Sequence, residues 1–302
     1  MGKKEKVIKE YGNNVAPIWR WILAAVLAIV VGGLLGGIMG YIIKALPFFK
    51  EGAYLFPEQD LLVGIASFAG IYLMFAVFIK KICKTKLRDF LFGVGRRPDI
   101  KGAWKIGGIF VICLILASLV DIKYIGFDFS NPGLWFINLL FVLLFLWIQT
   151  TTEEIMFRGL FLRAPFGNEI PSLKKGIIAA VISSLAFMAL HLPNPEVTSR
   201  SGIDAVIIAS SYFLSGMSMF VPNLYLGGLE GGVLIHWLNN FICFVVIKQE
   251  VTVMSTPTLF VDHIPLTSPI MTLLNVVISE VPILILSLVL IIRREKEKKS
   301  FN

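Results

Sequence analysis

Long apolar stretches separated by short polar connections dominate this chain. A transmembrane helix needs about 20 mostly apolar residues, and about eight stretches approach that length. They lie near residues 18–43, 61–79, 106–121, 134–161, 176–192, 203–221, 229–247 and 270–292. The pattern predicts an all-α protein, a polytopic membrane helical bundle of about eight transmembrane helices.

The composition supports a membrane protein. The chain has 302 residues, of which 56% are hydrophobic and only 16% are charged, whereas soluble domains carry about 25% charged residues. We expect one membrane-embedded domain over residues 1–302, with the chemistry in 134–247. The net charge of +8 does not indicate nucleic acid, because the basic residues lie in short connections between apolar stretches. The partner that the composition predicts is therefore membrane lipid.

The charges of the connections predict the orientation. Basic residues concentrate at the N-terminus, after the second and fourth stretches, and in the tail, whereas the alternate connections are mixed or acidic. The basic ones include Lys3, Lys4, Lys6 and Lys9, then Lys80 to Lys105, then Arg163, Lys174 and Lys175, then Arg293 to Lys299; the alternate ones carry Asp121, Asp128, Glu196, Arg200, Glu250 and Asp262. Because cytoplasmic loops are enriched in Lys and Arg, both termini are expected in the cytoplasm.

Two further patterns concern packing. Gly32, Gly36 and Gly40 form a smooth stripe at four-residue spacing, which allows another helix to approach closely. We expect that helix to belong to the same bundle, and no oligomer is predicted. The basic run at 80–105 contains Leu87, Phe90, Leu91 and Phe92 and is expected to form an amphipathic helix on the membrane surface.

Polar groups inside the apolar stretches are the candidate chemistry. Ionisable residues in hydrocarbon are costly, and they usually face a cavity and serve a function. Glu154 and Arg158 are four residues apart and can pair on one helix face, while Glu153 points about 100° away. Taken alone, this cluster is equally well read as a charged helix end at the interface.

Two histidines complete the set. His191 ends an apolar stretch, with Phe187 one turn earlier where it can shield the imidazole from lipid. His236 and Asn240 lie four apart on one face, whereas the adjacent Asn239 is expected to point elsewhere. An interfacial histidine and a polar pair between helices are the plain alternatives. Acid, imidazole and amide together are the parts of a hydrolytic site.

These motifs resemble a known family. Glu-Glu-x-x-x-Arg at 153–158, Phe-x-x-x-His at 187–191 and His-x-x-x-Asn at 236–240, in this order, are similar to the signature of the CPBP intramembrane proteases. That family includes CAAX prenyl endopeptidases and bacterial proteins tied to bacteriocin processing or self-immunity. The resemblance implies a hydrolase that crosses the plasma membrane several times. We expect the protein to be bacterial.

The resemblance also implies roles. Glu153, helped by His191, would activate a water, while His236 and Asn240 would stabilise the oxyanion or hold the water. Glu154 and Arg158 would shape the first motif. The family is often classed as metalloproteases, and Glu153, His191 and His236 could supply three zinc ligands with an open position. A metal-free glutamate mechanism uses the same residues and is slightly favoured, so the cofactor stays open.

The depth of these residues raises a geometric problem. Glu153 is expected near the cytoplasmic end of its helix, whereas His191 would lie roughly 20 Å from that side at 1.5 Å per residue. They can meet only if the fourth helix continues past Arg158 and the fifth is tilted or starts deeper. We expect a cavity that opens to the cytoplasm.

Three functions compete. Peptide-bond hydrolysis within the membrane is the first, and its expected partner is a peptide or membrane-anchored protein substrate. The second is a non-catalytic self-immunity or scaffold protein, and the third is a transporter that uses the buried groups as a proton relay. The chain lacks two equivalent halves with interrupted helices, which argues against a transporter. The physiological substrate is not predicted.

Overall fold

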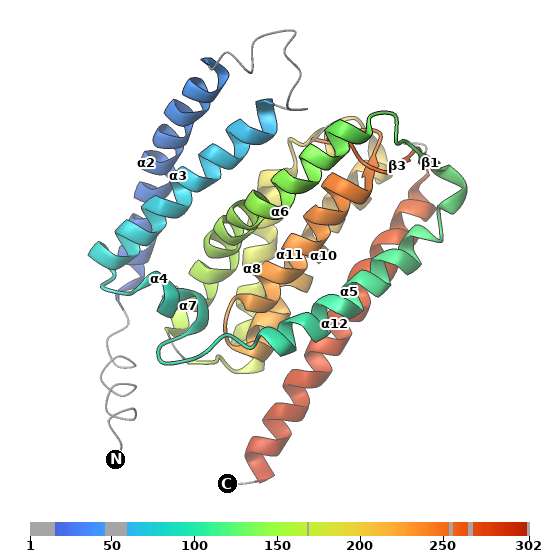
Figure 1. Cartoon of the computed structure of the whole chain (residues 1–302). Helices are drawn as coiled ribbons and strands as arrows, with labels where there is room; N and C mark the ends of the chain where they lie inside the picture. The colour runs from blue at the N-terminus through green and yellow to red at the C-terminus, as the bar shows by residue number, and fades with distance from the viewer. Residues whose placement is uncertain (1–15, 46–58, 168, 254–255, 265–267, 301–302) are drawn as a thin grey trace.

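The computed structural model describes residues 16–45, 59–167, 169–253, 256–264 and 268–300. Long helices run up and down through a single bundle (Figure 1). They are α2 (Ile18–Ala45), α3 (Gln59–Ile82), α5 (Ile100–Ser118), α6 (Pro132–Glu154), α8 (Leu173–His191), α10 (Gly202–Leu226), α11 (Glu230–Phe241) and α12 (Pro269–Ser300). Shorter pieces are α4 (Leu87–Phe92), α7 (Leu160–Phe166), α9 (Pro195–Thr198) and the 3₁₀ turn η2 (Ile122–Tyr124).

The membrane-protein prediction is confirmed. Seven helices in the described residues are long and apolar enough to cross a membrane, and a shorter apolar helix, Glu230–Val246, makes an eighth stretch. The span whose length differs most from the expected length is the fourth, which covers Pro132–Phe166 rather than 134–161. It is continuous because α6 passes through a π-helical turn, η3 (Ile155–Gly159), into α7.

Helix starts follow local sequence signals. Asn131 precedes Pro132 and accepts a hydrogen bond from the Leu134 N–H at 3.1 Å. Asp99 accepts one from Gly102 N–H at 2.9 Å at the start of α5. Both are N-terminal caps of the kind that satisfy the unpaired N–H groups of a first turn.

The glycine stripe packs inside the bundle, as expected. A Cβ at Gly32 or Gly36 would collide with the backbone of Ile71 or Ser67 on α3, and one at Gly40 would meet Val63. The backbones of α2 and α3 therefore approach closely, and Figure 1 shows these two helices side by side. Van der Waals packing of this kind is what holds helices together where lipid surrounds them.

The bundle has two chemically different ends. At the basic end lie the connections 83–99, 167–172 and 227–229, together with the start of α2 and the end of α12 (Figure 1). At the sheet end lie the connections 119–131 and 192–201 and the described residues 247–253 and 256–264. The N-terminal lysines, residues 3 to 9, lie outside the described residues.

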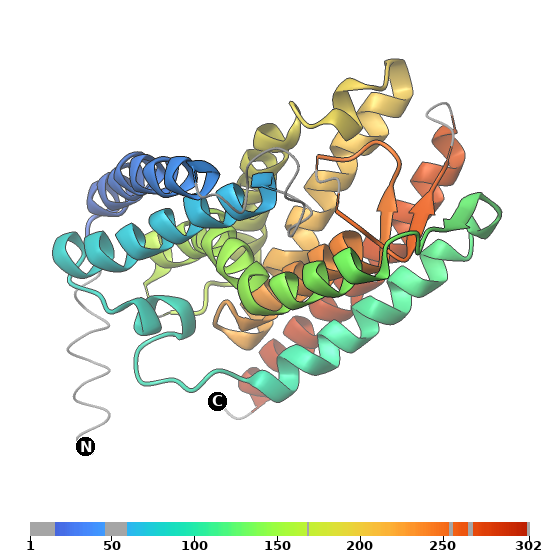
Figure 2. The same cartoon turned by 45° about the horizontal axis from the view of Figure 1, so that its top comes forward.

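A small sheet, absent from the sequence prediction, closes one end of the bundle. Its strands are β1 (Ile125–Phe127), β2 (Ile247–Gln249) and β3 (Phe260–Asp262), in the order β1-β3-β2. β1 pairs antiparallel with β3, with Gly126 opposite Val261, and β2 pairs parallel with β3, with Lys248 opposite Val261. Figure 2 shows the strands beside the ends of α5 and α12. Strands of three residues leave no pattern that distinguishes them from loops.

The expected surface helix in 80–105 is wrong in its packing. Between the end of α3 at Ile82 and the start of α5 at Ile100, only Leu87–Phe92 is helical, and the side chains of Phe90 and Leu91 are buried in the main hydrophobic core. Phe90 lies against Trp21, with ring centroids 5.3 Å apart. These apolar side chains therefore cap the bundle from its basic end instead of lying on the membrane.

Candidate active site

Buried polar groups from separate helices come together in the bundle. Glu153 and Glu154 end α6, and His236 lies in α11. The imidazole of His236 faces both carboxylates: its Nδ1 lies 2.9 Å from Glu154 Oε1 and its Nε2 lies 3.7 Å from Glu153 Oε2. The Glu-Glu pair and the second histidine motif thus form one cluster, as the sequence predicted.

Arg158 balances the charge of Glu154. The two side chains are fully buried and form an ion pair of 3.0 Å one turn apart. The guanidinium also lies 4.3 Å above the ring of Phe187, in a cation–π arrangement. The π-helical turn that follows Glu154 carries Arg158, and such turns are frequent at functional sites. This buried ion pair holds Glu154 in position to accept the hydrogen bond from His236.

Glu153 is the carboxylate that faces open space. Its Oε1 accepts a hydrogen bond from Gln149 Nε2 at 3.1 Å, and its Oε2 points toward His236 Nε2 without a hydrogen bond. Its side chain retains 10% exposure whereas that of Glu154 has none. The two neighbouring acids therefore have different roles, one in the structure and one at the cavity.

His191 presents a free ring nitrogen to the same cavity. Its Nδ1 lies 2.7 Å from the carbonyl oxygen of Phe187, and because a carbonyl can only accept, Nδ1 carries the proton. In that tautomer Nε2 holds a lone pair. The ring stacks on Tyr212 at 4.6 Å, and Asn194 Nδ2 donates to the Tyr212 hydroxyl at 3.1 Å.

Phe187 links the two imidazoles. Its ring is almost fully buried and lies 4.2 Å from the His191 ring and 6.1 Å from the His236 ring, by centroids. The expectation that it shields an imidazole thus extends to both histidines.

Asn240 lines the cavity, and so does Asn239. Asn239 Nδ2 donates to Asn240 Oδ1 at 3.1 Å. The expectation that Asn239 points away is therefore wrong. Adjacent helical residues diverge by about 100°, but two amide side chains are long enough to meet across that angle. The bond leaves the Asn240 carbonyl engaged and directs its NH₂ group elsewhere.

The cavity has a volume of about 540 Å³, and it runs from the acid–histidine cluster to the sheet end. Its floor includes Glu153, His236 and Met219. Its upper walls come from the tops of the helices and from the strand β2. No residue of the connections at the basic end is among the described residues that line it. The cavity therefore extends toward the sheet end of the bundle and not toward the basic end, where the sequence analysis expected it to open.

The length of the fourth span explains how the motifs meet. From Glu153 the helix runs on to Phe166, which at 1.5 Å per residue places Glu153 about 20 Å from the basic end. His191, at the far end of α8, then lies close enough to line the same cavity. The condition that the helix continue past Arg158 is met.

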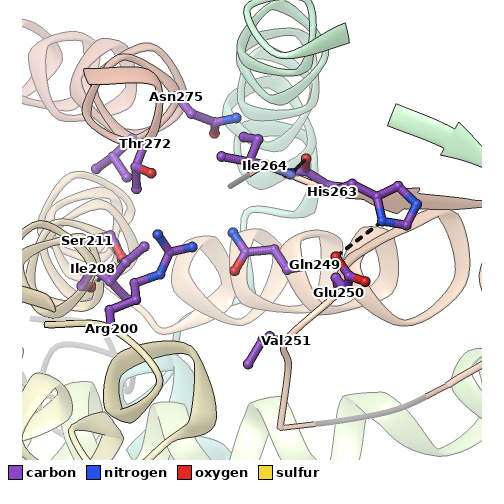
Figure 3. Close-up of a pocket in the computed structure, with 12 residues that line it drawn as sticks. Arg200, Ile208, Ser211, Gln249, Glu250, Val251, His263, Ile264, Thr272 and Asn275 are labelled. Atoms are coloured by element: carbon purple, nitrogen blue, oxygen red, sulfur yellow. Dashed lines mark hydrogen bonds and ion pairs between the residues drawn. The ribbon is translucent and has the colours of Figure 1, made fainter. Parts of the chain in front are cut away.

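A second cavity of about 400 Å³ adjoins the first beneath the sheet. Figure 3 shows Arg200 and Gln249 directed into it, while His263 turns toward Glu250 on the rim. His263 Nδ1 lies 3.3 Å from Glu250 Oε2, and both side chains are more than half exposed. The third histidine of the chain is therefore a surface residue.

Sequence reasoning missed several supporting residues. Asn223 Oδ1 accepts from Gly232 N–H at 2.7 Å beneath Glu154, and a Cβ at Gly232 would collide with both side chains. Glu280 lines the cavity and accepts hydrogen bonds from Ser215 and Ser218. A polar residue in a span was the available signal for Asn223 and Glu280, and the glycine pair at 231–232, which allows a neighbour to approach closely, was the signal for Gly232.

The donor set does not fit a metal ion in this arrangement. Among the described residues, no three His, Cys, Asp or Glu side chains are grouped so as to hold one. Glu153 and His236 meet, but Phe187 packs against His191 and His236 instead of leaving them to converge. No step of the chemistry below is therefore assigned to a metal.

Residues 134–242 match a family model described as type II CAAX prenyl endopeptidase Rce1-like. This segment of the chain is Rce1-like. The match confirms the resemblance to the CPBP family. Neither the curated proteins nor the solved structures gave a match to the chain.

The Rce1-like segment coincides with the helices that form the site. It begins in α6 and ends just after Asn240, so all three motifs lie within it. The helices α2, α3, α5 and α12 lie outside it. Of these, α3, α5 and α12 contribute walls of the cavity, such as Phe68, Leu114 and Glu280. A multi-pass membrane protein with an Rce1-like segment is what the sequence and fold together establish.

Proposed function

We propose that this protein is an intramembrane endopeptidase that hydrolyses a peptide bond with a water activated by Glu153. The observation that carries the proposal is the Glu153 carboxylate, which faces a cavity and lies 3.7 Å from an imidazole held by a second, charge-neutralised carboxylate. A general base must lie within reach of the proton that it removes, and a water beside Glu153 and His236, in the cavity that His191 also lines, satisfies that condition.

The chemistry follows from the arrangement. Glu153 accepts one proton of the water, and Nε2 of His191, which lines the same cavity, accepts a hydrogen bond from the other and orients the water. Glu154 holds Nδ1 of His236, which keeps the ring in place beside Glu153. The water oxygen bonds to the carbonyl carbon, and Glu153 passes the proton to the leaving nitrogen as the C–N bond breaks.

Asn240 is the candidate donor to the developing oxyanion. Its carbonyl accepts from Asn239, which orients its NH₂ group, and a donor fixed in advance gains the most in a site sheltered from water. Removing one such donor typically lowers turnover by about 10²–10³. The buried helices around the cluster supply that shelter.

Two pairs of variants test the proposal. Purified Glu153→Gln and His191→Ala are compared with Glu169→Gln and His263→Ala, which change exposed residues outside the cavity. Each is incubated with solubilised membrane proteins, and new peptide termini are counted by mass spectrometry. We expect the cavity variants to lose about 10²-fold or more of the activity and the matched variants to keep it. Cleavage by Glu153→Gln at the wild-type rate would refute the assignment.

A further inference from the structure

We infer that the catalytic cavity opens on the non-cytoplasmic side of the membrane, and that the substrate is a basic peptide segment exposed on that side. The part of the inference that concerns the substrate rests on the proposed function. The topological part rests on three independent observations: the charge of the two ends of the bundle, the residues that line the cavity, and the seal beneath the site.

The first observation is the charge asymmetry. In the part of the chain that the structure describes, basic residues far outnumber acidic ones at the basic end, which includes Lys80, Lys81, Arg96, Arg97, Lys174 and Arg293. At the sheet end, acidic residues outnumber basic ones; the described charges there are Asp121, Lys123, Asp128, Glu196, Arg200, Asp204, Lys248, Glu250 and Asp262. Because short loops rich in Lys and Arg stay in the cytoplasm, the sheet end faces outward.

The second observation is the course of the cavity. From Glu153 and His236 its lining leads to Asn194, Glu196, Lys248 and Val253, all in connections at the sheet end. Val253 is 53% exposed, so the cavity meets solvent there. A substrate that enters by this route comes from the side opposite the basic loops.

The third observation is a closed floor. Beneath the acid–histidine cluster lie Ile155, Phe220, Leu229 and Phe90, each with at most 1% of its surface exposed. Arg163 seals the gap below them, because its guanidinium donates to the carbonyls of Phe90, Gly167 and Gly227. A peptide cannot pass this layer without unpacking the core, so the basic end offers no entrance to the site.

The charges along the cavity indicate which class of peptide it favours as a substrate. Five carboxylates line it, those of Asp121, Glu153, Glu196, Asp262 and Glu280, whereas Lys248 is the one Lys or Arg among the described lining residues. Complementary potential steers charged partners and rejects like charges. A segment with Lys or Arg beside the scissile bond is therefore favoured over an acidic one.

Cysteine labelling tests the orientation without any need for catalysis. In a Cys243→Ala background, Val253→Cys and Ile247→Cys report on the mouth and wall of the cavity, and Lys101→Cys reports on the basic end. A charged, membrane-impermeant maleimide is added to intact cells or to permeabilised ones. We expect Val253→Cys and Ile247→Cys to react in intact cells and Lys101→Cys only after permeabilisation. The reverse pattern would overturn the inference, even for a protein with no activity.

Peptide cleavage tests the substrate half. Two fluorescence-quenched peptides that differ only in flanking residues, Lys or Glu, are offered to right-side-out and inverted membrane vesicles that carry the full chain. We expect cleavage by right-side-out vesicles, with the Lys peptide preferred about tenfold and the preference reduced by salt and by Glu196→Gln. Cleavage by inverted vesicles alone, or equal use of both peptides, contradicts the inference. Labelling as expected with no cleavage in either vesicle contradicts the proposed function instead.

Discussion

Nδ1 of His236 lies 2.9 Å from Oε1 of Glu154, the same oxygen that pairs with Arg158. One carboxylate oxygen therefore holds the His236 imidazole and a buried cation together. Glu154 contributes to the site through this contact, while its neighbour Glu153 directs its carboxylate to the cavity. The adjacency of the two acids in sequence hides this division of roles.

The Glu154–Arg158 pair should be costly to break on one side only. Glu154→Gln leaves the guanidinium buried without its counter-charge, and removing one partner of a buried pair typically costs about 3–5 kcal/mol. We expect a clear fall in the thermal unfolding midpoint of the purified protein. The double variant Glu154→Gln/Arg158→Met should recover part of the loss, because no unpaired charge remains. Equal destabilisation by the single and double variants would contradict this account.

Gly232 should not accept a side chain. A Cβ there would collide with the Glu154 carboxylate, the Asn223 amide and the Met219 carbonyl, and overpacking usually costs about 1–3 kcal/mol. We expect Gly232→Ala to be less stable and to lose activity, since the collision displaces Glu154 from His236. Gly108→Ala is the matched control, because nothing lies within 4 Å of its added methyl. Two variants with the same melting temperature would argue against the close approach of α11 and α6 at this glycine.

Tyr212 should act on activity through its ring and not through its hydroxyl. The ring stacks on His191 at 4.6 Å, and the hydroxyl only accepts from Asn194. Tyr212→Ala frees the imidazole to turn and should lower turnover about tenfold, less than the loss expected for a general acid–base group itself. Tyr212→Phe keeps the stack and should retain most of the activity. The measurement is the rate of peptide cleavage by each variant. A loss in Tyr212→Phe as large as that in Tyr212→Ala would show that the hydroxyl, and not the ring, supports activity.

Asp262 should make stability depend on pH. Burial raises its pKa from 3.8 to about 6, against the hydrogen bond from Ile264 N–H, and the nearby Asp121 raises it further. Between these two values the folded protein holds a proton that the unfolded chain has lost. Stability from this group is therefore complete at low pH and falls as pH rises through about 6, at up to about 1.4 kcal/mol per pH unit.

The Asp262→Asn variant checks this sign. Asparagine cannot ionise, so the melting temperature of the variant should change less between pH 5 and 7 than that of the wild type, and it should exceed the wild-type value at pH 7. A wild-type melting temperature that rises over the same interval, with Asp262→Asn unchanged relative to it, would show that Asp262 does not set the slope.

The sequence by itself determined the membrane-spanning class and the identity of the polar groups. Twenty-residue apolar stretches have few alternatives, because a helix satisfies every backbone hydrogen bond within lipid. The helical spacings of Glu154 and Arg158, and of Phe187 and His191, also fixed which side chains share a face, since 3.6 residues per turn is a local property.

Only the tertiary structure decided how those faces meet. The π-helical turn after Glu154, the continuation of the helix to Phe166 and the close approach at Gly232 each depend on contacts between segments far apart in the chain. The course of the cavity toward the sheet end depends on them too, because it is the space that packed side chains from many helices leave open. Periodicity shows which face of a helix is polar. Packing sets which helix that face contacts, how deep the polar residues lie in the bundle and where the cavity opens.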